Sequence, residues 1–463
     1  MKILLIHASI SGCGFESFSK GDPTESSWIN HGLCSISAYA KKNGFIPELI
    51  DLRLLRNWAD FKLAIQLKKP DVVGLSMMSV DYNPVMKCAK IIKQCNKNTK
   101  IIVGGPHPTI VPEDMRGNQD IDYIITGEGE ISFTKLLQGI KEGLQTEKII
   151  PGIKPVLDEL PFIDRELYSG HEMPILPELP QPFMTLIAGR GCMYNCSFCQ
   201  PAERKLFGDQ VRRRSADNII EELKELRVKY GFKSLMIHDD CITEDVNWVE
   251  RFCFLYAKEG FKAPFVCQSR ADLICRNENL IEKMKEAGLY MFIIGFESGN
   301  QRILNFLRKG TTVEQNYKAA QICRKYGIKI WANYMMGMPT ETKQEVQDTL
   351  KMIKEISPDH CSPAFFTPHP GSDLYEYCQK HDLSLIKSHD EYRRNPHGAK
   401  IKGVDYKFLN DALIHSLQIS KKDHLLKSLL RNKTVIFLKN RIKGTKAGKE
   451  IIKGLKKMVY HEK

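Results

Sequence analysis

Residues 189–199 read GRGCMYNCSFC and place three thiols, Cys192, Cys196 and Cys199, on one short segment. The segment comes directly after an apolar run that is typical of a buried strand. Three thiols spaced four and three residues apart can bind one metal centre. A structural zinc site would need a fourth ligand nearby, and the next candidate is His238. A 4Fe–4S cluster held by three cysteines instead leaves one iron open for chemistry.

The chain after this segment alternates predicted strands and helices. The predicted strands are Met184–Ala188, Ser234–His238, Phe265–Gln268, Tyr290–Gly295, Ile330–Met335 and Cys361–Phe366. These strand–helix units are too few for a complete eightfold barrel, which takes about 250 residues. We therefore expect a partial (β/α)6 barrel of the TIM type over residues 183–375, with its functional residues at the carboxyl ends of the strands.

Residues 1–145 show a similar alternation. The apolar runs that suit buried parallel strands are Ile3–Ile6, Pro47–Asp51, Asp71–Ser76, Lys100–Gly104 and Tyr123–Thr126. This pattern predicts an open parallel sheet with helices on both faces, which binds its ligand beyond the carboxyl ends of the strands. Glycine-rich loops follow the last two strands, at residues 104–109 (GGPHPT) and 127–130 (GEGE), where the backbone can approach a large flat ligand closely.

Two further regions complete the predicted organisation. Residues 146–182 contain seven prolines, which do not fit a regular helix or a central strand, so this region is predicted to be a linker. Residues 376–463 are predicted to be helical and, towards their end, basic.

The cysteine segment resembles that of radical S-adenosylmethionine (SAM) enzymes, and the resemblance continues over the barrel. It is carried by the sequences HDD (238–240), SR (269–270), GFESG (295–299), KGT (309–311), MGMP (336–339) and TPHPG (367–371). Residues 1–145 resemble the Rossmann-like, flavodoxin-like cobalamin-binding domain that precedes the barrel in one large branch of this superfamily. The GGPHPT and TGEGE sequences carry that second resemblance, and together the two cover the chain up to about residue 375.

The resemblance implies three cofactors: a 4Fe–4S cluster, SAM and cobalamin. Cys192, Cys196 and Cys199 would ligate the cluster, whose open iron would chelate SAM. The residues implied to lie near SAM are Phe198, Asp239, Arg270, Glu297 and Gly337. The residues implied to contact cobalamin are Ser76, Gly104, Gly105, His107, Gly127 and Glu128. One electron from the cluster would cleave SAM to a 5′-deoxyadenosyl radical, so the site must be dry and closed.

The chain departs from the cobalamin pattern at one place. Methionine synthase-like proteins carry Asp-x-His-x-x-Gly after the first strand, and that histidine coordinates cobalt. Here the loop at residues 9–14 reads SISGCG, and the motif occurs nowhere in the chain. We therefore expect cobalamin to bind with its own base displaced and no histidine below cobalt. The lack of this lower ligand would favour transfer of a methyl group from cobalt, because the axial ligand is a main control on metal reactivity. The alternative is a first domain that binds no cobalamin and only supports the barrel.

Several of these residues also have structural interpretations. The prolines that flank His107 favour a backbone role over contact through its ring. Asp240 could be a helix N-cap, and Arg270 could belong to a structural ion pair. Cys241 and Cys361, near predicted strand ends, are expected to be small buried hydrophobic residues and not redox relays.

The leading functional hypothesis is C-methylation of an unactivated carbon by a cobalamin-dependent radical SAM enzyme. The alternatives are an oxidative cyclase or rearrangement enzyme that transfers no methyl group, like the anaerobic magnesium-protoporphyrin ester cyclase, and a corrinoid-binding regulatory protein. An RNA-modifying enzyme is a weaker alternative, because the N-terminal domain lacks the cysteine set of the methylthiolating enzymes. We expect a small-molecule or lipid substrate and an electron donor such as flavodoxin or ferredoxin.

Composition excludes several classes of protein. The chain has 463 residues with 42% hydrophobic and 27% charged side chains, so it is neither disordered nor a small disulfide scaffold. Its 14 scattered cysteines and short apolar runs favour a reduced, cytoplasmic protein. The net charge of +13 is concentrated in residues 421–463, which carry 14 Lys and Arg against three acidic residues. This segment could lie on an anionic membrane or cover the barrel mouth, and nucleic-acid binding is not expected.

Overall fold

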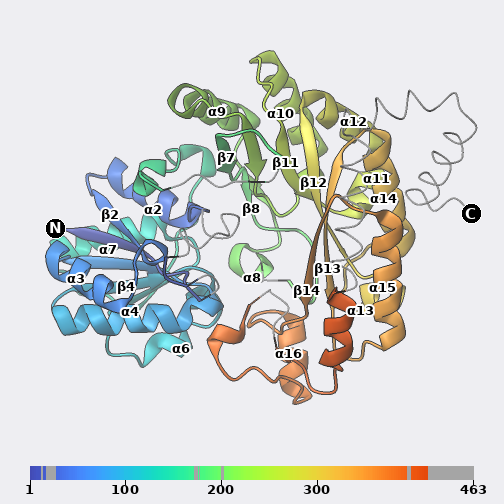
Figure 1. The fold of residues 1–463 in the computed structure, drawn as a ribbon. Helices are drawn as coiled ribbons and strands as arrows, with labels where there is room; N and C mark the ends of the chain where they lie inside the picture. Colours follow the sequence, from blue (N-terminus) through green and yellow to red (C-terminus); the bar gives the residue numbers. More distant parts are fainter. Residues whose placement is uncertain are drawn as a thin grey trace, which may run out of the picture.

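The computed structural model describes residues 1–11, 14–16, 28–171, 176, 178–199, 203–393 and 398–414. The predictions for residues 421–463, and for residues 12 and 13 of the first loop, lie outside this part of the chain. Two parallel sheets, each with six strands, make up the body of the molecule. Figure 1 shows the N-terminal sheet in blue to cyan beside the second sheet in green to orange.

The first sheet has the strand order β2-β1-β3-β4-β5-β6, and its strands pair in parallel. Its strands are β1 (Ile3–His7), β2 (Pro47–Asp51), β3 (Val72–Ser76), β4 (Lys100–Gly104), β5 (Tyr123–Thr126) and β6 (Ile149–Pro151). The order reverses between β1 and β3, which is the flavodoxin-like topology and creates a crevice at the carboxyl ends of these strands. The predicted fold class of this part is confirmed.

Helices cover both faces of the first sheet. They are α2 (His31–Lys42), α3 (Trp58–Lys68), α4 (Tyr82–Cys95), α5 (Pro106–Ile110), α6 (Glu113–Arg116) and α7 (Gly129–Lys141). Alternate residues of β1 point to opposite faces. Leu4 therefore packs in one cluster with Phe61 of α3, and Leu5 packs in another with Phe133 of α7. The continuous apolar character of the strands follows from this burial on both sides.

The second sheet has the order β14-β13-β12-β11-β10-β7, again entirely parallel. Its strands are β7 (Phe183–Leu186), β10 (Ser234–Ile237), β11 (Phe265–Ser269), β12 (Leu289–Glu297), β13 (Lys329–Met336) and β14 (His360–Phe365). Each strand follows its neighbour in sequence order, as in a barrel. The six predicted strands and the partial barrel are confirmed.

Helices line the outside of this sheet (Figure 1). The longer ones are α9 (Ala216–Tyr230), α10 (Val246–Lys258), α12 (Glu278–Ala287), α14 (Val313–Lys325) and α15 (Lys343–Ile356). The shorter ones are α8 (Glu203–Phe207), α11 (Ala271–Arg276), α13 (Gln301–Phe306) and α16 (Asp373–Lys380). No helix within the described residues combines the length and the apolar character needed to cross a membrane.

Three local features differ from the predicted elements. The short strand β6 joins the first sheet, although it lies in the region predicted as a linker; its proline is tolerated because β6 is an edge strand. The GGPHPT sequence does not remain a loop, because residues 106–110 form helix α5 with a proline at its first position. A small antiparallel pair, β8 (Gly189–Arg190) with β9 (Arg212–Arg213), frames the cysteine segment.

Candidate active site

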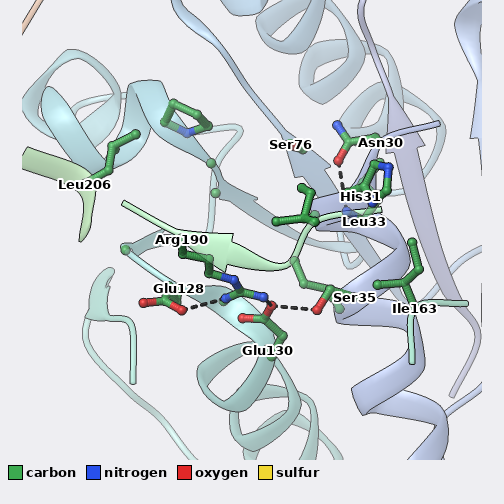
Figure 2. A pocket seen from close by; sticks show the side chains of 18 of the residues that line it. Asn30, His31, Leu33, Ser35, Ser76, Glu128, Glu130, Ile163, Arg190 and Leu206 are labelled. Atoms are coloured by element: carbon green, nitrogen blue, oxygen red, sulfur yellow. Dashed lines mark hydrogen bonds and ion pairs between the residues drawn. The ribbon is translucent and has the colours of Figure 1, made fainter. Parts of the chain in front are cut away.

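A cavity of about 480 Å³ lies where the carboxyl ends of the two sheets meet. Figure 2 shows its lining, with Arg190 of β8 reaching towards the N-terminal domain. Five of the residues predicted to contact cobalamin line it: Ser76, Gly104, Gly105, Gly127 and Glu128. The barrel contributes Gly189, Arg190, Gly191 and Asp239. The cavity therefore adjoins both the glycine-rich loops of the first domain and the start of the cysteine segment.

In the glycine-rich wall of this cavity, the backbone at Gly105 leaves no room for a side chain. Gly105 has φ +104°, and a Cβ there would lie 3.0 Å from the backbone N and O of Met77. Thr109 ties the two loops together, because its hydroxyl donates to the Gly105 carbonyl (2.7 Å) and accepts from the Gly127 amide (2.8 Å). A bare backbone wall at the switch point of a doubly wound sheet fits a large planar ligand such as a corrinoid.

His107, although predicted to contact cobalamin, does not line the cavity. Its ring is fully buried on the other side of α5, where Nδ1 lies 3.1 Å from the Ser79 hydroxyl and Nε2 lies 3.3 Å from Asp114 Oδ2. Of the two roles considered for His107, contact through its ring does not fit this geometry, while the favoured backbone role stays a prediction. Because Pro106–Ile110 form helix α5, the side chain at position 107 points away from the cavity.

Glu128 lies at the cavity wall, but its carboxylate is paired with arginines of the barrel. Arg190 donates to Glu128 (2.5 Å) and to Glu130 (2.6 Å), as Figure 2 shows. Arg212 also pairs with Glu128. Ser35 donates to the same Glu130 carboxylate (2.7 Å). Although burial opposes ionisation, Arg190 holds the pKa of Glu130 below its usual value. This ion-pair cluster joins the two domains directly beside the cysteine segment.

The structure brings three other predicted residues together around Cys196. The Arg270 guanidinium lies 3.7 Å from the Cys196 sulfur and 3.6 Å from the centre of the Tyr194 ring. It also donates to the carbonyl of Lys309. The Lys309 ammonium lies 2.9 Å from Glu297 Oε1, and 5.9 Å from the centre of the Phe198 ring. The predicted set Cys196, Phe198, Arg270 and Glu297 is therefore one cluster of neighbours.

Lys309 is the residue of this cluster to which the sequence assigned no role. Its only sequence signal was its place in the KGT sequence after β12 and α13. Its side chain is buried, and although burial opposes the charge, the Glu297 carboxylate raises the pKa of Lys309. Two cations, Lys309 and Arg270, thus lie next to a thiol ligand, where they can balance the negative charge of a thiolate-bound cluster.

Glu297 sits at an irregularity in the sheet. The pairing of β12 with β13 shifts register between Gly295 and Glu297, and Glu297 has φ +61°. That left-handed backbone is costly for a residue with a side chain and is concentrated at functional sites. This backbone conformation turns the Glu297 carboxylate towards Lys309. Gly295 lies beside the pair, and a Cβ added at Gly295 would come within 2.9 Å of the Lys309 ammonium, so only a glycine leaves room for it.

Asp239 and Gly337 hold backbone segments of the site. The Asp239 carboxylate accepts from the Ala188 amide (2.7 Å) and pairs with Arg213, so it orients the start of the cysteine segment. Gly337 has φ +81° and donates to Glu341 Oε2 (2.6 Å). Burial raises the pKa of Glu341 to about 7.

The spacing of the three thiols in the structure does not match a mononuclear zinc site. Zinc–sulfur bonds of about 2.3 Å would require the sulfurs to lie about 3.8 Å apart. Among the described residues, which include Cys192, Cys196 and Cys199, these sulfurs do not all lie within 4.8 Å of one another. Burial raises the pKa of Cys192 to about 11 and that of Cys199 to about 12, so metal binding must displace their protons.

Of the other candidates, Cys241 is buried, and burial raises its pKa to about 12, as expected for a small hydrophobic residue. Asp240 lines the cavity and is not a helix N-cap; Asp245 caps α10 instead.

Comparison with known proteins identifies the two domains. The radical SAM superfamily model matches residues 186–353, and the B12 binding domain model matches residues 22–137. An uncharacterized methyltransferase of Pyrococcus horikoshii is 30% identical over 78% of this chain and 81% of its own length. An anaerobic magnesium-protoporphyrin IX monomethyl ester cyclase of Rubrivivax gelatinosus is 25% identical over 81% of this chain and 70% of its own length.

A solved structure has the same fold. The radical SAM methyltransferase TsrM from Kitasatospora setae, with cobalamin and a 4Fe–4S cluster bound, superposes with a TM-score of 0.66. The alignment covers 90% of this chain and 89% of that chain at 15% identity. With its two matched domains, its cysteine segment and its glycine-lined cavity, the chain belongs to the radical SAM enzymes that carry a cobalamin-binding domain, and its cofactors are a 4Fe–4S cluster, SAM and cobalamin.

Proposed function

We propose that this enzyme transfers a methyl group to an unactivated carbon of a small-molecule or lipid substrate. The observation that supports this is the single cavity lined by Gly104 and Gly105 of the cobalamin-binding domain and by Gly189–Gly191, which lead into Cys192. The cavity thus adjoins the proposed cobalamin loops and the start of the cysteine segment, although the three thiols themselves are not among its lining residues. A reaction that uses both cofactors on one substrate requires sites that neighbour each other in this way. The Pyrococcus horikoshii and Kitasatospora setae relatives are both named methyltransferases.

In this proposal the protein binds and positions its cofactors. Cys192, Cys196 and Cys199 hold the cluster, while Arg270 and Lys309 stabilise the charge beside Cys196. The residues proposed to border SAM are Phe198, Asp239, Arg270, Glu297 and Gly337. The residues proposed to border cobalamin are Ser76, Gly104, Gly105, Gly127 and Glu128. When bound, the cluster and SAM supply hydrogen abstraction, and cobalamin supplies methyl-transfer chemistry.

The cavity walls can exclude water from this chemistry. Leu5, Ile36, Phe133, Leu206 and Phe207 contribute apolar surface to the lining. A dry wall protects a reactive species from solvent and strengthens the charge interactions near the cysteines. The arginine pairs of Glu128 and Glu130 would keep this wall closed by holding the barrel against the first domain.

The test is turnover of the reconstituted holoenzyme with reductant, methyl-labelled SAM and fractions of small molecules and lipids from the source cells. We expect label in a product, together with 5′-deoxyadenosine and S-adenosylhomocysteine. The Cys196→Ala variant, which lacks a cluster ligand, is the control. Substrate consumption with 5′-deoxyadenosine but no S-adenosylhomocysteine would contradict methylation and favour an oxidative cyclisation like that named for the Rubrivivax gelatinosus relative.

The same proposal includes the surroundings of the enzyme. We propose a flavodoxin or ferredoxin as electron donor, a cytoplasmic location and a peripheral membrane contact through the basic residues 421–463. We also propose that residues 1–145, 146–182, 183–375 and 376–463 act as the cobalamin-binding domain, linker, barrel and C-terminal region. Liposome sedimentation of the full chain and of a chain ending at Ser420 measures the membrane contact.

A further inference from the structure

A cluster of potential metal ligands lies on the outer side of helix α5, away from the cavity. It consists of His107, Asp114 and His389, each of which offers one ligand atom within 4.8 Å of the other two. His107 belongs to α5 and Asp114 to α6, both in the first domain. His389 begins the short helix η6 (His389–Glu391), which follows the barrel in sequence. Figure 1 shows the orange segment after α16 returning towards the blue helices α4 and α6.

The distances in this cluster suit a tetrahedral metal ion. His107 Nε2 lies 3.3 Å from Asp114 Oδ2, and His389 Nε2 lies 3.7 Å from the same oxygen. With zinc–nitrogen and zinc–oxygen bonds of about 2.0 Å, the ligand atoms of a tetrahedral site lie about 3.3 Å apart. The first distance already matches this value and the second needs only a small side-chain movement. The ligand atoms of the two histidines lie within 4.8 Å of each other, so these rings must also move closer on binding.

His107 shows a second, independent sign of a missing ligand. Its side chain is completely buried, and its Nε2 has no hydrogen-bond partner of good geometry among the described residues. A buried polar nitrogen without a hydrogen bond is costly, so such an atom calls for a partner. This nitrogen faces Asp114 and His389, which are partly exposed, at 40% and 29%, and leave a path for an ion.

The surroundings orient the two rings as a metal site would. The Ser79 hydroxyl lies 3.1 Å from His107 Nδ1, so that nitrogen can donate to Ser79 while Nε2 keeps its lone pair. Tyr82 stacks on His389 with ring centres 4.0 Å apart. Burial lowers the pKa of His107 to about 4, which keeps the ring neutral, the form that binds metals.

We propose that His107, Asp114 and His389 bind a divalent transition-metal ion, zinc by its preference for this donor set, with a water molecule as fourth ligand. The ion joins η6 to the cobalamin-binding domain, next to hydrogen bonds from Asn83 to Ser388 (3.1 Å) and Asp390 (2.9 Å). Because Gly105 and Pro106 at the start of α5 line the cavity, the ion stiffens the cofactor wall from behind. The site is structural and independent of the methylation proposal.

The experiment measures zinc in the full-length holoenzyme, in which the iron–sulfur cluster occupies Cys192, Cys196 and Cys199. Chelator-treated protein receives one equivalent of zinc and passes through gel filtration, and elemental analysis then gives zinc, iron and cobalt per chain. We expect close to one zinc in the wild type and at least a tenfold weaker affinity in Asp114→Asn and His389→Ala. Ser79→Ala, which removes the orienting hydroxyl, should weaken zinc binding about 10- to 100-fold.

The matched control is His381→Ala, which removes an exposed histidine that does not belong to the group of His107, Asp114 and His389. This variant should bind zinc as the wild type does. Iron and cobalt contents equal to the wild type show that each variant is folded. Zinc should also raise the melting temperature of the wild type and not that of Asp114→Asn. Wild-type protein that retains no zinc, or variants that retain as much zinc as the wild type, would overturn the proposal.

Discussion

Arg190 offers the sharpest test of how the two domains are held together. In the structure it donates to the buried carboxylates of Glu128 and Glu130, whose side chains are 3% and 5% exposed. The substitution Arg190→Met keeps the length of the side chain and removes the charge. Breaking a buried ion pair by removing one partner costs about 3–5 kcal/mol. Since Arg212 still pairs with Glu128, we expect the lower end, about 3 kcal/mol.

The expected change in melting temperature follows from the size of the chain. Unfolding entropies of about 2.1 cal/mol/K per residue amount to about 1 kcal/mol/K over the whole protein. A loss of 3 kcal/mol thus lowers the melting temperature by about 3 °C at pH 7.5, measured by circular dichroism. The control is Arg56→Met, which breaks an exposed ion pair with Asp60 and should leave the melting temperature close to that of the wild type.

The pH dependence distinguishes this explanation from a general packing defect. In the wild type the pKa of Glu130 is lowered, so its contribution to stability is present above about pH 4.5 and is lost as the pH falls. Without Arg190, burial is opposed by the Ser35 and backbone hydrogen bonds but no longer by a charge, so we expect the pKa of Glu130 to rise and the variant to take up a proton at a higher pH. The difference between variant and wild type should therefore shrink between pH 7.5 and pH 5. An equal difference at both pH values would refute this reasoning.

The remaining predictions concern the cofactor sites. Cys196→Ala should abolish the iron–sulfur absorbance of reconstituted protein, and retention of a full cluster would contradict its role. Gly105→Ala, which strains a backbone at φ +104°, should lower cobalamin retention in gel filtration at least tenfold. Lys309→Met leaves the buried Glu297 unpaired and should weaken SAM binding in calorimetry while iron content stays unchanged. Because burial raises the pKa of Glu341 to about 7, Glu341→Gln should become more stable relative to wild type as the pH rises from 5 to 8, measured by thermal unfolding.

The strand pattern was predictable because parallel strands buried on both faces leave a local signature. Runs such as residues 3–6 and 101–103 are apolar throughout, and both lie in central strands of the first sheet. The edge strand β6 was missed because it is short and ends in a proline within a proline-rich region. Helix α5 was missed because the sequence GGPHPT has the composition of a loop, although its first proline suits the first turn of a helix.

By itself, the sequence determined that three thiols lie on one segment and that glycines follow the ends of strands. It also determined that two regions of alternating strands and helices follow one another along the chain. Each of these properties is visible in short, local stretches of sequence. Only the tertiary structure decided which side chains meet. Arg190 and Glu128 are 62 positions apart, and Arg270 and Cys196 are 74 apart. His107 and His389 are 282 positions apart. The direction of a side chain such as His107 depends on the helix that carries it, and the partner it meets depends on how the two domains pack.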